Sequence, residues 1–192
     1  MTGGAVIQTD NFEKVEIAST GDLRTWLTDN HGQEASVWLV TWKKTTPDKY
    51  VSTGEVLDEL LCFGWIDGIR RKLDDDRTMQ LIAPRRVQHW SKTYKYRAAR
   101  LEAEGRMTDA GRAAIAASKA NGSWSFLDDV DALIVPDDLA TALTNGDWEG
   151  YAPSYRRNVL RWIKLAKTPA TRAKRVAEAA RATAEGRKIP QM

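Results

Sequence analysis

The sequence predicts an α+β protein: a small N-terminal sheet in the order β-α-β-α-β-β, with helices packed on it, followed by an all-helical C-terminal half. Residues 12–83 alternate short runs rich in β-branched and aromatic side chains with segments of helical periodicity. After Pro84 every apolar run has helical spacing. We therefore expect an α/β body over residues 1–90 and a helical region over residues 91–192, packed on the body or appended to it.

Four segments have the character of strands. Residues 12–17 alternate apolar and charged side chains, and residues 37–42 are rich in β-branched and aromatic side chains. Residues 65–73 and 78–83 are two further strands, and the acidic run 74–76 between them predicts a turn. The pattern does not tell whether the sheet is parallel or mixed.

Capping residues and prolines mark the helices. In the body, Ser19 is expected to cap the first helix and Thr53 the second, which ends at Gly64. The starts of the later helices are expected at Ser91, Thr108, Pro136, Pro153 and Pro169. The inner face of the alanine-rich last helix is expected to consist of Ala173, Val176, Ala177, Ala180 and Ala184.

A single cysteine and the lack of targeting signals indicate the compartment. Cys62 cannot form an intramolecular disulfide, which fits a reducing compartment, and its apolar neighbours predict a buried, inert thiol. Neither a signal peptide nor a run of roughly 20 apolar residues, the length of a membrane span, occurs in the sequence. We therefore expect a soluble, cytoplasmic protein.

The net charge of +3 conceals an asymmetry along the chain. Residues 151–192 hold eleven Lys and Arg residues against Glu178 and Glu185, a net charge of +9, so residues 1–150 carry −6. A basic segment of this kind can bind nucleic acid or an anionic membrane surface. Alternatively, the basic helices dock on the acidic body or face solvent, and the regular apolar stripe between their basic residues favours this second interpretation.

The segment 61–90 carries the candidate site, and Asp67 is its first member. This acid stands between Ile66 and Gly68 at a helix-to-strand junction, where we expect it to be partly buried. A buried carboxylate must be paired or hydrogen-bonded, or it becomes protonated. One interpretation is an internal ion pair that fixes the hairpin. The other is an acid that orients a ligand amine or hydroxyl, or acts as a base.

Arginines and tryptophans surround this acid in the sequence. The planar guanidinium fork suits a carboxylate or a phosphate, and indole rings can supply apolar walls or stacking faces. The pattern therefore indicates a site for a small anionic molecule. Its expected ligand-binding residues are Trp65, Asp67, Arg70, Arg77, Arg85 and Trp90.

The sequence contains no motif for a nucleotide, nucleophile or metal site. It contains no phosphate loop, dinucleotide fingerprint, nucleophile motif or zinc spacing, and His31 and His89 are too far apart to form a metal motif. We therefore expect no cofactor and no metal, and whether the protein is an enzyme stays open. Eight tryptophans are enough for some to be exposed, so a homodimer contact is also considered.

Several runs resemble the bacteriocin-protection family, also called the YdeI or OmpD-associated family. The most specific are Leu-Cys-Phe-Gly-Trp-Ile-Asp-Gly at 61–68, Pro-Arg at 84–85 followed by Trp-Ser-Lys at 90–92, and Arg-Trp-Ile at 161–163. The resemblance spans about Val37 to Arg187. It implies a link to resistance against cationic antimicrobial peptides and bacteriocins, and no agreed activity or ligand. The family often has an asparagine two or three positions after Trp-Ser-Lys. If that asparagine lines a pocket, either Tyr94 replaces it here or the specificity has changed.

Three hypotheses of function follow. The first is a protein that binds a small anionic ligand in a stress or antimicrobial-resistance role. The second is an enzyme that uses Asp67 as a general acid or base at the same arginine-rich site. The third is binding of nucleic acid or an anionic surface by the C-terminal helices, through Arg156, Arg157, Arg161, Lys164, Arg172, Lys174 and Arg175.

Overall fold

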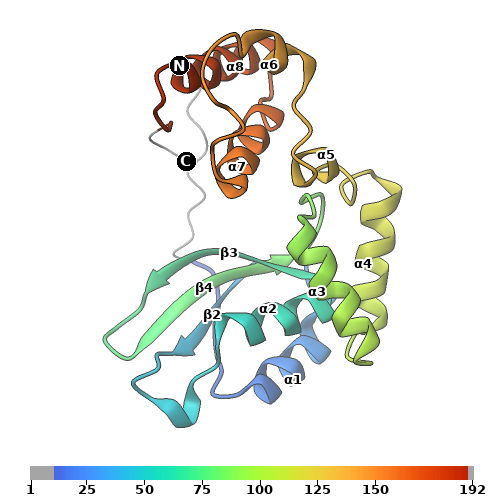
Figure 1. The fold of residues 1–192 in the computed structure, drawn as a ribbon. Coiled ribbons are helices and arrows are strands. Elements are labelled where there is room, and N and C mark those ends of the chain that lie inside the picture. The colour runs from blue at the N-terminus through green and yellow to red at the C-terminus, as the bar shows by residue number, and fades with distance from the viewer. Residues whose placement is uncertain (1–10, 190–192) are drawn as a thin grey trace. The chain divides into compact units, whose positions relative to one another are not determined.

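A four-stranded mixed sheet is the centre of the N-terminal part of the protein, as the computed structural model shows (Figure 1). The structure describes residues 11–189. The strands are β1 (Lys14–Glu16), β2 (Val37–Trp42), β3 (Trp65–Lys72) and β4 (Arg77–Pro84), in the spatial order β1-β2-β4-β3. β1 is parallel to β2, whereas β4 is antiparallel to both β2 and β3. The predicted α+β class and the order β-α-β-α-β-β are confirmed.

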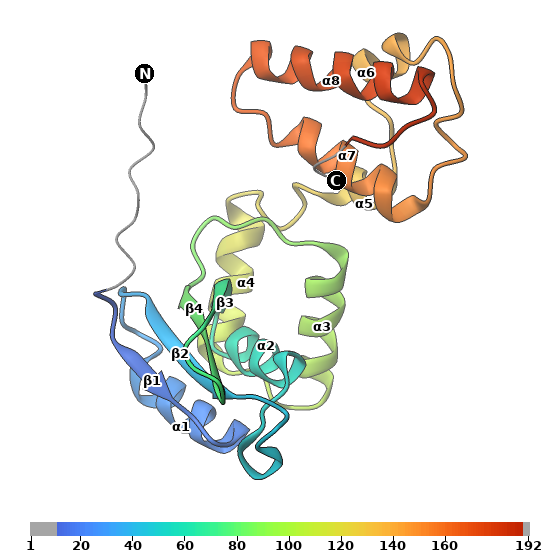
Figure 2. The same cartoon turned by 90° about the vertical axis from the view of Figure 1, so that its left-hand side faces the viewer.

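Four α-helices complete this first unit, which comprises residues 1–88 and 93–124. They are α1 (Thr20–Asn30), α2 (Thr53–Cys62), α3 (Lys92–Ala103) and α4 (Asp109–Ala120), and a short 3₁₀ turn, η1, covers Pro47–Lys49. α1 and α2 lie side by side beneath the sheet (Figure 1). α3 and α4 are consecutive helices joined by residues 104–108, and Figure 2 shows them apart, with α2 drawn between them.

The ends of α1 and α2 follow from capping chemistry. The Ser19 side chain accepts a hydrogen bond from the Asp22 amide, as predicted. α2 is capped by Ser52, so the prediction of Thr53 as its cap is wrong by one residue. Ser52 is the N-cap because it forms a reciprocal capping box with Glu55, in which each side chain accepts a hydrogen bond from the other residue's backbone amide.

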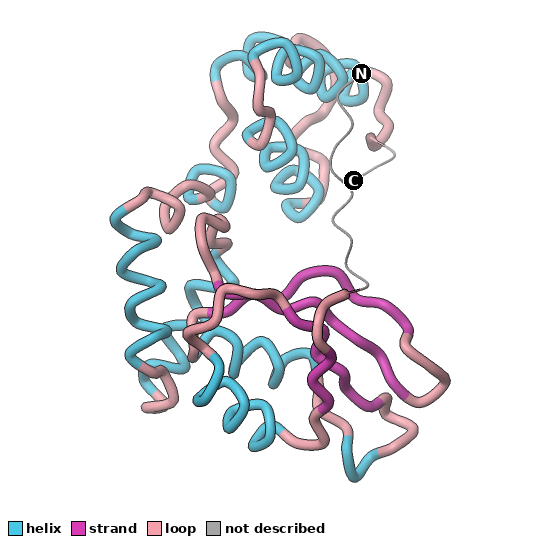
Figure 3. The backbone as a smooth tube through the Cα atoms, turned by 180° about the vertical axis from the view of Figure 1, so that it is seen from behind, coloured by secondary structure: helices cyan, strands magenta, loops and turns pink. Residues whose placement is uncertain are grey.

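The second unit, residues 89–92 and 125–192, contains helices and loops among its described residues (Figure 3). Its helices are α5 (Asp128–Asp131), α6 (Asp137–Ala142), α7 (Pro153–Lys164) and α8 (Pro169–Ala184). Their core includes Leu139, Tyr155, Val159, Ile163 and Val176. No helix within residues 11–189 is long and apolar enough to cross a membrane.

The predicted inner face of α8 is partly wrong. Val176 is buried as expected, but the other buried residues are Ala179, Ala182 and Thr183, whereas Ala173 and Ala177 are exposed. The helix has alanines on several sides, so its hydrophobic periodicity carries little information about which side faces the core.

Candidate functional site

A β-bulge in β3 sets up the candidate site. Asp67 is paired with Ile82 of β4 and Arg70 with Gln80, so two residues of β3 oppose a single residue of β4 between these pairs. In a regular strand, residues three apart point to opposite faces. The bulge instead puts Asp67 and Arg70 on the same face. Gly68 suits the bulge, since an added Cβ would lie 3.3 Å from a backbone carbonyl oxygen of β4.

Gln80 connects Asp67 and Arg70. Its amide nitrogen donates to Oδ2 of Asp67 at 3.1 Å, and its amide oxygen accepts from a guanidinium nitrogen of Arg70 at 2.8 Å. Gln80 itself is buried, whereas Asp67 is half-buried and Arg70 is exposed. The chain of contacts therefore runs from the interior of the sheet to solvent.

Tyr94 of α3 closes the other side of the carboxylate. Its hydroxyl donates to Oδ1 of Asp67 at 2.6 Å, and the guanidinium carbon of Arg85 lies 5.4 Å from the centroid of its ring. Arg85 follows the last residue of β4, and its amide donates to the carbonyl of Gly64 at 2.8 Å. The side chains of Arg70, Gln80, Asp67, Tyr94 and Arg85 thus form one connected cluster, which we call the Asp67 cluster.

Burial dominates the electrostatics of the Asp67 cluster. Arg85 is only 9% exposed, and this burial lowers the pKa of its guanidinium despite the opposing influence of Tyr94 and Asp67. The pKa of Tyr94 is raised, first by burial and then by its hydrogen bond to the Asp67 carboxylate. Tyr94 is therefore protonated at neutral pH and donates its hydroxyl hydrogen to the Asp67 carboxylate. The guanidinium of Arg85 is partly desolvated.

The structure does not bring every predicted residue to this cluster. Trp65 is 1% exposed in the core, where its indole NH donates to the His31 carbonyl at 3.1 Å. Arg77 lies at the opposite end of β4 from Arg85 and forms ion pairs with Asp74 and Glu16.

Trp90 is buried and belongs to the second unit. Aromatic character predicted a wall of the site for Trp65 and Trp90. Both side chains are buried, as large apolar groups usually are, and their role as walls of a site stays a prediction.

Two members of the Asp67 cluster were not predicted as ligand-binding residues. Tyr94 was noted only as a departure from the family pattern, and its distance of 27 residues from Asp67 gives no local signal. Gln80 is a polar residue in an otherwise apolar strand segment, which is the signal that could have identified it.

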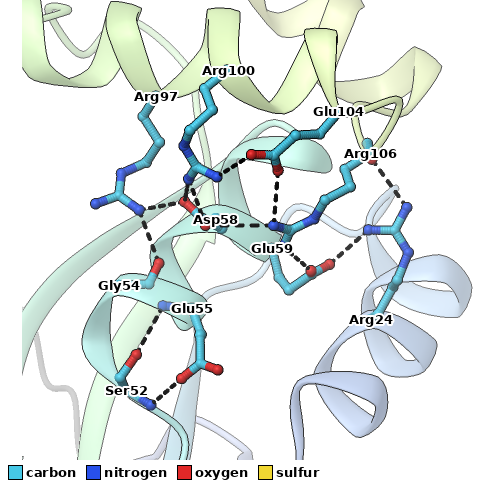
Figure 4. A network of polar contacts seen from close by, with 10 residues as sticks. All are labelled: Arg24, Ser52, Gly54, Glu55, Asp58, Glu59, Arg97, Arg100, Glu104 and Arg106. Atoms are coloured by element: carbon cyan, nitrogen blue, oxygen red, sulfur yellow. Dashed lines mark hydrogen bonds and ion pairs between the residues drawn. The ribbon is translucent and has the colours of Figure 1, made fainter.

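A second polar cluster, shown in Figure 4, ties the helices of the first unit together. Two adjacent buried acids on α2, Asp58 and Glu59, are its centre. Asp58 pairs with Arg97 and Arg100 of α3, and its contact with Arg100 measures 2.7 Å. Glu59 pairs with Arg24 of α1 at 2.8 Å and with Arg106 at 2.7 Å. Each acid has cationic partners and little exposure, so the arrangement is that of a structural ion-pair network.

Four of the seven basic residues that were expected to contact phosphates have acidic partners within the second unit. Ion pairs join Arg156 to Glu149, Arg157 to Asp131, Lys164 to Asp129 and Arg172 to Asp138. These acids precede residue 151 in the sequence, which is why the charge count along the chain overstated the basic character of the folded unit.

The tryptophans, the metal-ligating residue types and the cysteine can also be located in the structure. Of the eight tryptophans, four are buried and four are half-buried, so exposed indole rings do not support a homodimer contact. Within residues 11–189, no group of three or more His, Cys, Asp and Glu side chains is placed to hold a metal ion. The Cys62 thiol is buried, and burial raises its pKa.

Comparison with known proteins gives two family matches. Residues 15–114 match the family described as "Domain of unknown function (DUF8412)". Residues 132–186 match the family described as "Bacteriocin-protection, YdeI or OmpD-Associated", which confirms the resemblance for that region. The motif at 61–68 and the whole Asp67 cluster lie outside the second match and inside the first. No curated protein and no solved structure matches the chain.

Proposed function

Because the chain belongs to the DUF8412 family, whose description assigns no activity, we propose its function from the site: it binds a small anionic molecule at the Asp67 cluster. One observation carries the proposal. The guanidinium of Arg85, largely buried, faces the ring of the same tyrosine whose hydroxyl is bonded to Asp67. The guanidinium also donates to the Gln88 carbonyl at 3.1 Å, which orients it, and a bound anion would add to the stabilisation of a charge that burial disfavours.

The side chains of the cluster have complementary roles in this proposal. Arg85 and Arg70 supply guanidinium groups close to Asp67 and Tyr94, and the planar guanidinium fork suits an anionic ligand. The Asp67 carboxylate and the Tyr94 hydroxyl oxygen can accept hydrogen bonds from the neutral part of the ligand, such as an amine or hydroxyl, while the Tyr94 proton stays hydrogen-bonded to Asp67. Asp67 is half-buried and Arg70 exposed, so a small molecule can reach both.

We further propose that binding serves a stress or antimicrobial-resistance role in the cytoplasm. The support is the name of the family that matches residues 132–186, which refers to bacteriocin protection. The test is survival of a strain lacking the gene when challenged with a bacteriocin or a cationic peptide. Wild-type protein should restore survival, and a variant without the Arg85 charge should not.

Isothermal titration of the full-length protein with inorganic phosphate and with citrate tests the binding itself. Arg85→Met keeps the apolar stem and removes the fork, and we expect binding at least about tenfold weaker, since a charged hydrogen bond contributes roughly 1.5–3 kcal/mol. Tyr94→Phe removes only the hydroxyl and should weaken binding less.

Arg77→Gln is the matched control for this titration. It removes a guanidinium from the first residue of β4, where Arg77 pairs with Asp74 and Glu16 at the end far from Arg85, so affinity should change less than about twofold. Equal binding by wild type and Arg85→Met would remove Arg85 from the site. If wild-type protein bound neither phosphate nor citrate, the anionic ligand class would be wrong.

A further inference from the structure

Gln80 holds two opposite charges apart at the Asp67 cluster. Its side chain is only 5% exposed, and its amide lies between the carboxylate of Asp67 and the guanidinium of Arg70. Among residues 11–189, neither Asp67 nor Arg70 has an ion-pair partner. By contrast, Arg77 at the start of the same strand pairs directly with two acids. A carboxylate and a guanidinium thus contact the same amide from its two ends without pairing with each other.

Hydrogen-bonding chemistry fixes the direction of the Gln80 amide. The Asp67 carboxylate only accepts hydrogen bonds, and the Arg70 guanidinium only donates them. The amide nitrogen therefore faces Asp67 at 3.1 Å, and the amide oxygen faces Arg70 at 2.8 Å. The reverse direction would oppose two acceptors at one end and two donors at the other. Gln80 is therefore a directional spacer between the two charges.

Both charged groups keep hydrogen-bonding capacity for a ligand. An ionised carboxylate has about four acceptor sites, and Asp67 uses one for Gln80 and one for Tyr94. A guanidinium has about five N–H donors, and Arg70 uses one of them for Gln80. Asp67 is half-buried and Arg70 is exposed, so solvent reaches both. The site therefore presents a negative group and a positive group side by side, each with capacity to bind an opposite charge.

We propose that the ligand of the Asp67 cluster is an acidic α-amino acid, with its ammonium group on Asp67 and its α-carboxylate on Arg70. The ammonium and the carboxylate of an α-amino acid follow the same order as the donor and the acceptor of the Gln80 amide, and they are only one bond further apart. The ligand would thus lie along the amide and match both charges that the amide separates. This inference rests on the proposed function and narrows its ligand class, since an acidic amino acid is still an anion.

L-Glutamate and glutarate test the ammonium contact, because they share one dicarboxylate frame and only glutamate carries an ammonium group. Glutarate has the larger negative charge, so a site that recognises negative charge alone would prefer it. In isothermal titration of the full-length protein, wild type should bind L-glutamate at least about tenfold more tightly than glutarate.

The outcomes separate this inference from the proposed function. Equal affinities, or tighter binding of glutarate, would overturn the amino-acid ligand and leave an anion site in place. Absence of glutamate binding in a protein that binds phosphate or citrate would do the same. If the protein bound none of the four compounds, the proposed function would fall and the inference with it.

Asp67→Asn assigns the ammonium to Asp67. The change keeps the size of the side chain and removes its charge, so the preference for glutamate over glutarate should fall from at least about tenfold to less than about twofold. A general loosening of the fold would weaken both ligands alike and leave their ratio unchanged. An unchanged ratio in Asp67→Asn would therefore overturn this contact.

Gln80→Leu tests the spacer itself. Leucine fills the buried position without an amide, so Asp67 and Arg70 become able to pair on the face that they share, and glutamate should bind at least about tenfold more weakly. Thr78→Val is the matched control on the same face of β4, where the Thr78 hydroxyl lies 3.2 Å from that of Thr41. Thr78 shares no partner with Gln80, so its substitution should change the affinity less than about twofold. Equal glutamate affinity of Gln80→Leu and Thr78→Val would overturn the role of the amide.

Discussion

Asp58 and Glu59 are adjacent buried acids on α2, and their side chains point in different directions. Each therefore needs its own cationic partner. Asp58 faces α3 and Glu59 faces α1, so α2 is clamped between its two neighbours (Figure 4). Burial raises the pKa of Asp58, but the hydrogen bonds from Arg100 and Arg97 outweigh it and hold that pKa below its ordinary value. The carboxylate is therefore charged and compensated in the folded protein.

Asp58→Asn should destabilise the protein. The change leaves Arg97 and Arg100 without their shared carboxylate. Removing one partner of a buried pair costs about 3–5 kcal/mol, and the partial exposure of these arginines to water reduces our expectation to about 1–3 kcal/mol. Urea unfolding followed by circular dichroism measures the difference.

Asp75→Asn is the matched control for this substitution. Asp75 pairs with Lys72 in the β3–β4 turn, where its side chain is 93% exposed. The same chemical change there should alter the free energy of unfolding by less than about 0.5 kcal/mol. If Asp58→Asn were equally harmless, the buried network would not be a stabilising clamp.

At the scale of elements, glycines let α2 and α4 approach each other closely. A Cβ added at Gly111 of α4 would lie 2.3 Å from the carbonyl oxygen of Cys62 and 2.5 Å from the sulfur of Met107. The same Cys62 carbonyl accepts hydrogen bonds from the amide and the hydroxyl of Thr108, which caps α4. The start of α4 is thus fixed on the end of α2.

Gly111→Ala should therefore be destabilising even though alanine favours helices. The gain in helix propensity is about 1 kcal/mol, whereas forcing a methyl group against backbone costs about 1–3 kcal/mol or more. Because the added Cβ would lie 2.3 Å from the Cys62 carbonyl oxygen, we expect the steric cost to exceed the gain in helix propensity. Thermal unfolding should show a clearly lowered Tm.

Gly54→Ala gives the opposite expectation on the partner helix. The added Cβ would lie 3.8 Å from the Ser52 hydroxyl, which is an ordinary contact, so only the propensity gain applies. This variant should unfold at the same temperature as wild type or at a higher one. If Gly111→Ala and Gly54→Ala changed the Tm in the same direction, the close approach of α2 and α4 would not control stability.

Local sequence signals predicted the elements better than their irregularities. Alternation and capping chemistry identified the four strands and the cap at Ser19, because these signals depend on neighbouring residues. The bulge that turns Arg70 toward Asp67 has no comparable signal. Strict alternation would have separated these two residues, so their shared face depends on a register that only the paired strand fixes.

At the scale of the whole molecule, charge and aromatic content were predicted less well. The basic C-terminal segment pairs with acids that lie earlier in the same unit, such as Asp129 and Asp138. Trp65 and Trp90 are buried, and Tyr94 contacts Asp67 from a helix 27 residues further along the chain. Both outcomes depend on contacts between distant parts of the chain, which composition and spacing do not encode.

The second unit contains a histidine in a cationic setting. His89 stacks on Phe126, with ring centroids 3.7 Å apart. The ammonium of Lys164 lies 4.8 Å from the centroid of the same Phe126 ring. Burial lowers the pKa of His89 below 6.5, and the charges of Arg161 and Lys164 lower it further. Asp129, paired with Lys164, offsets part of this positive charge.

This shift has a defined sign for stability. The pKa of His89 is lower in the folded than in the unfolded chain, so the unfolded chain binds the proton more tightly. The second unit should therefore lose stability as the pH falls below about 6.5 toward the folded-state pKa. The carboxylates of Asp129, Asp138 and Glu178 have lowered pKa values, so their contribution is lost only below their ordinary values of 3.8 and 4.5.

Hydrogen exchange of the full-length protein between pH 7 and pH 5 should reveal this loss. After correction for intrinsic rates, the protection of α7 and α8 should decrease with falling pH, and His89→Gln should remove the decrease because glutamine does not titrate. His31→Gln changes the other histidine, which lies in the first unit, and should leave the decrease in place. A decrease that persists unchanged in His89→Gln would mean that another group titrates, since the carboxylates named above are inactive in this range.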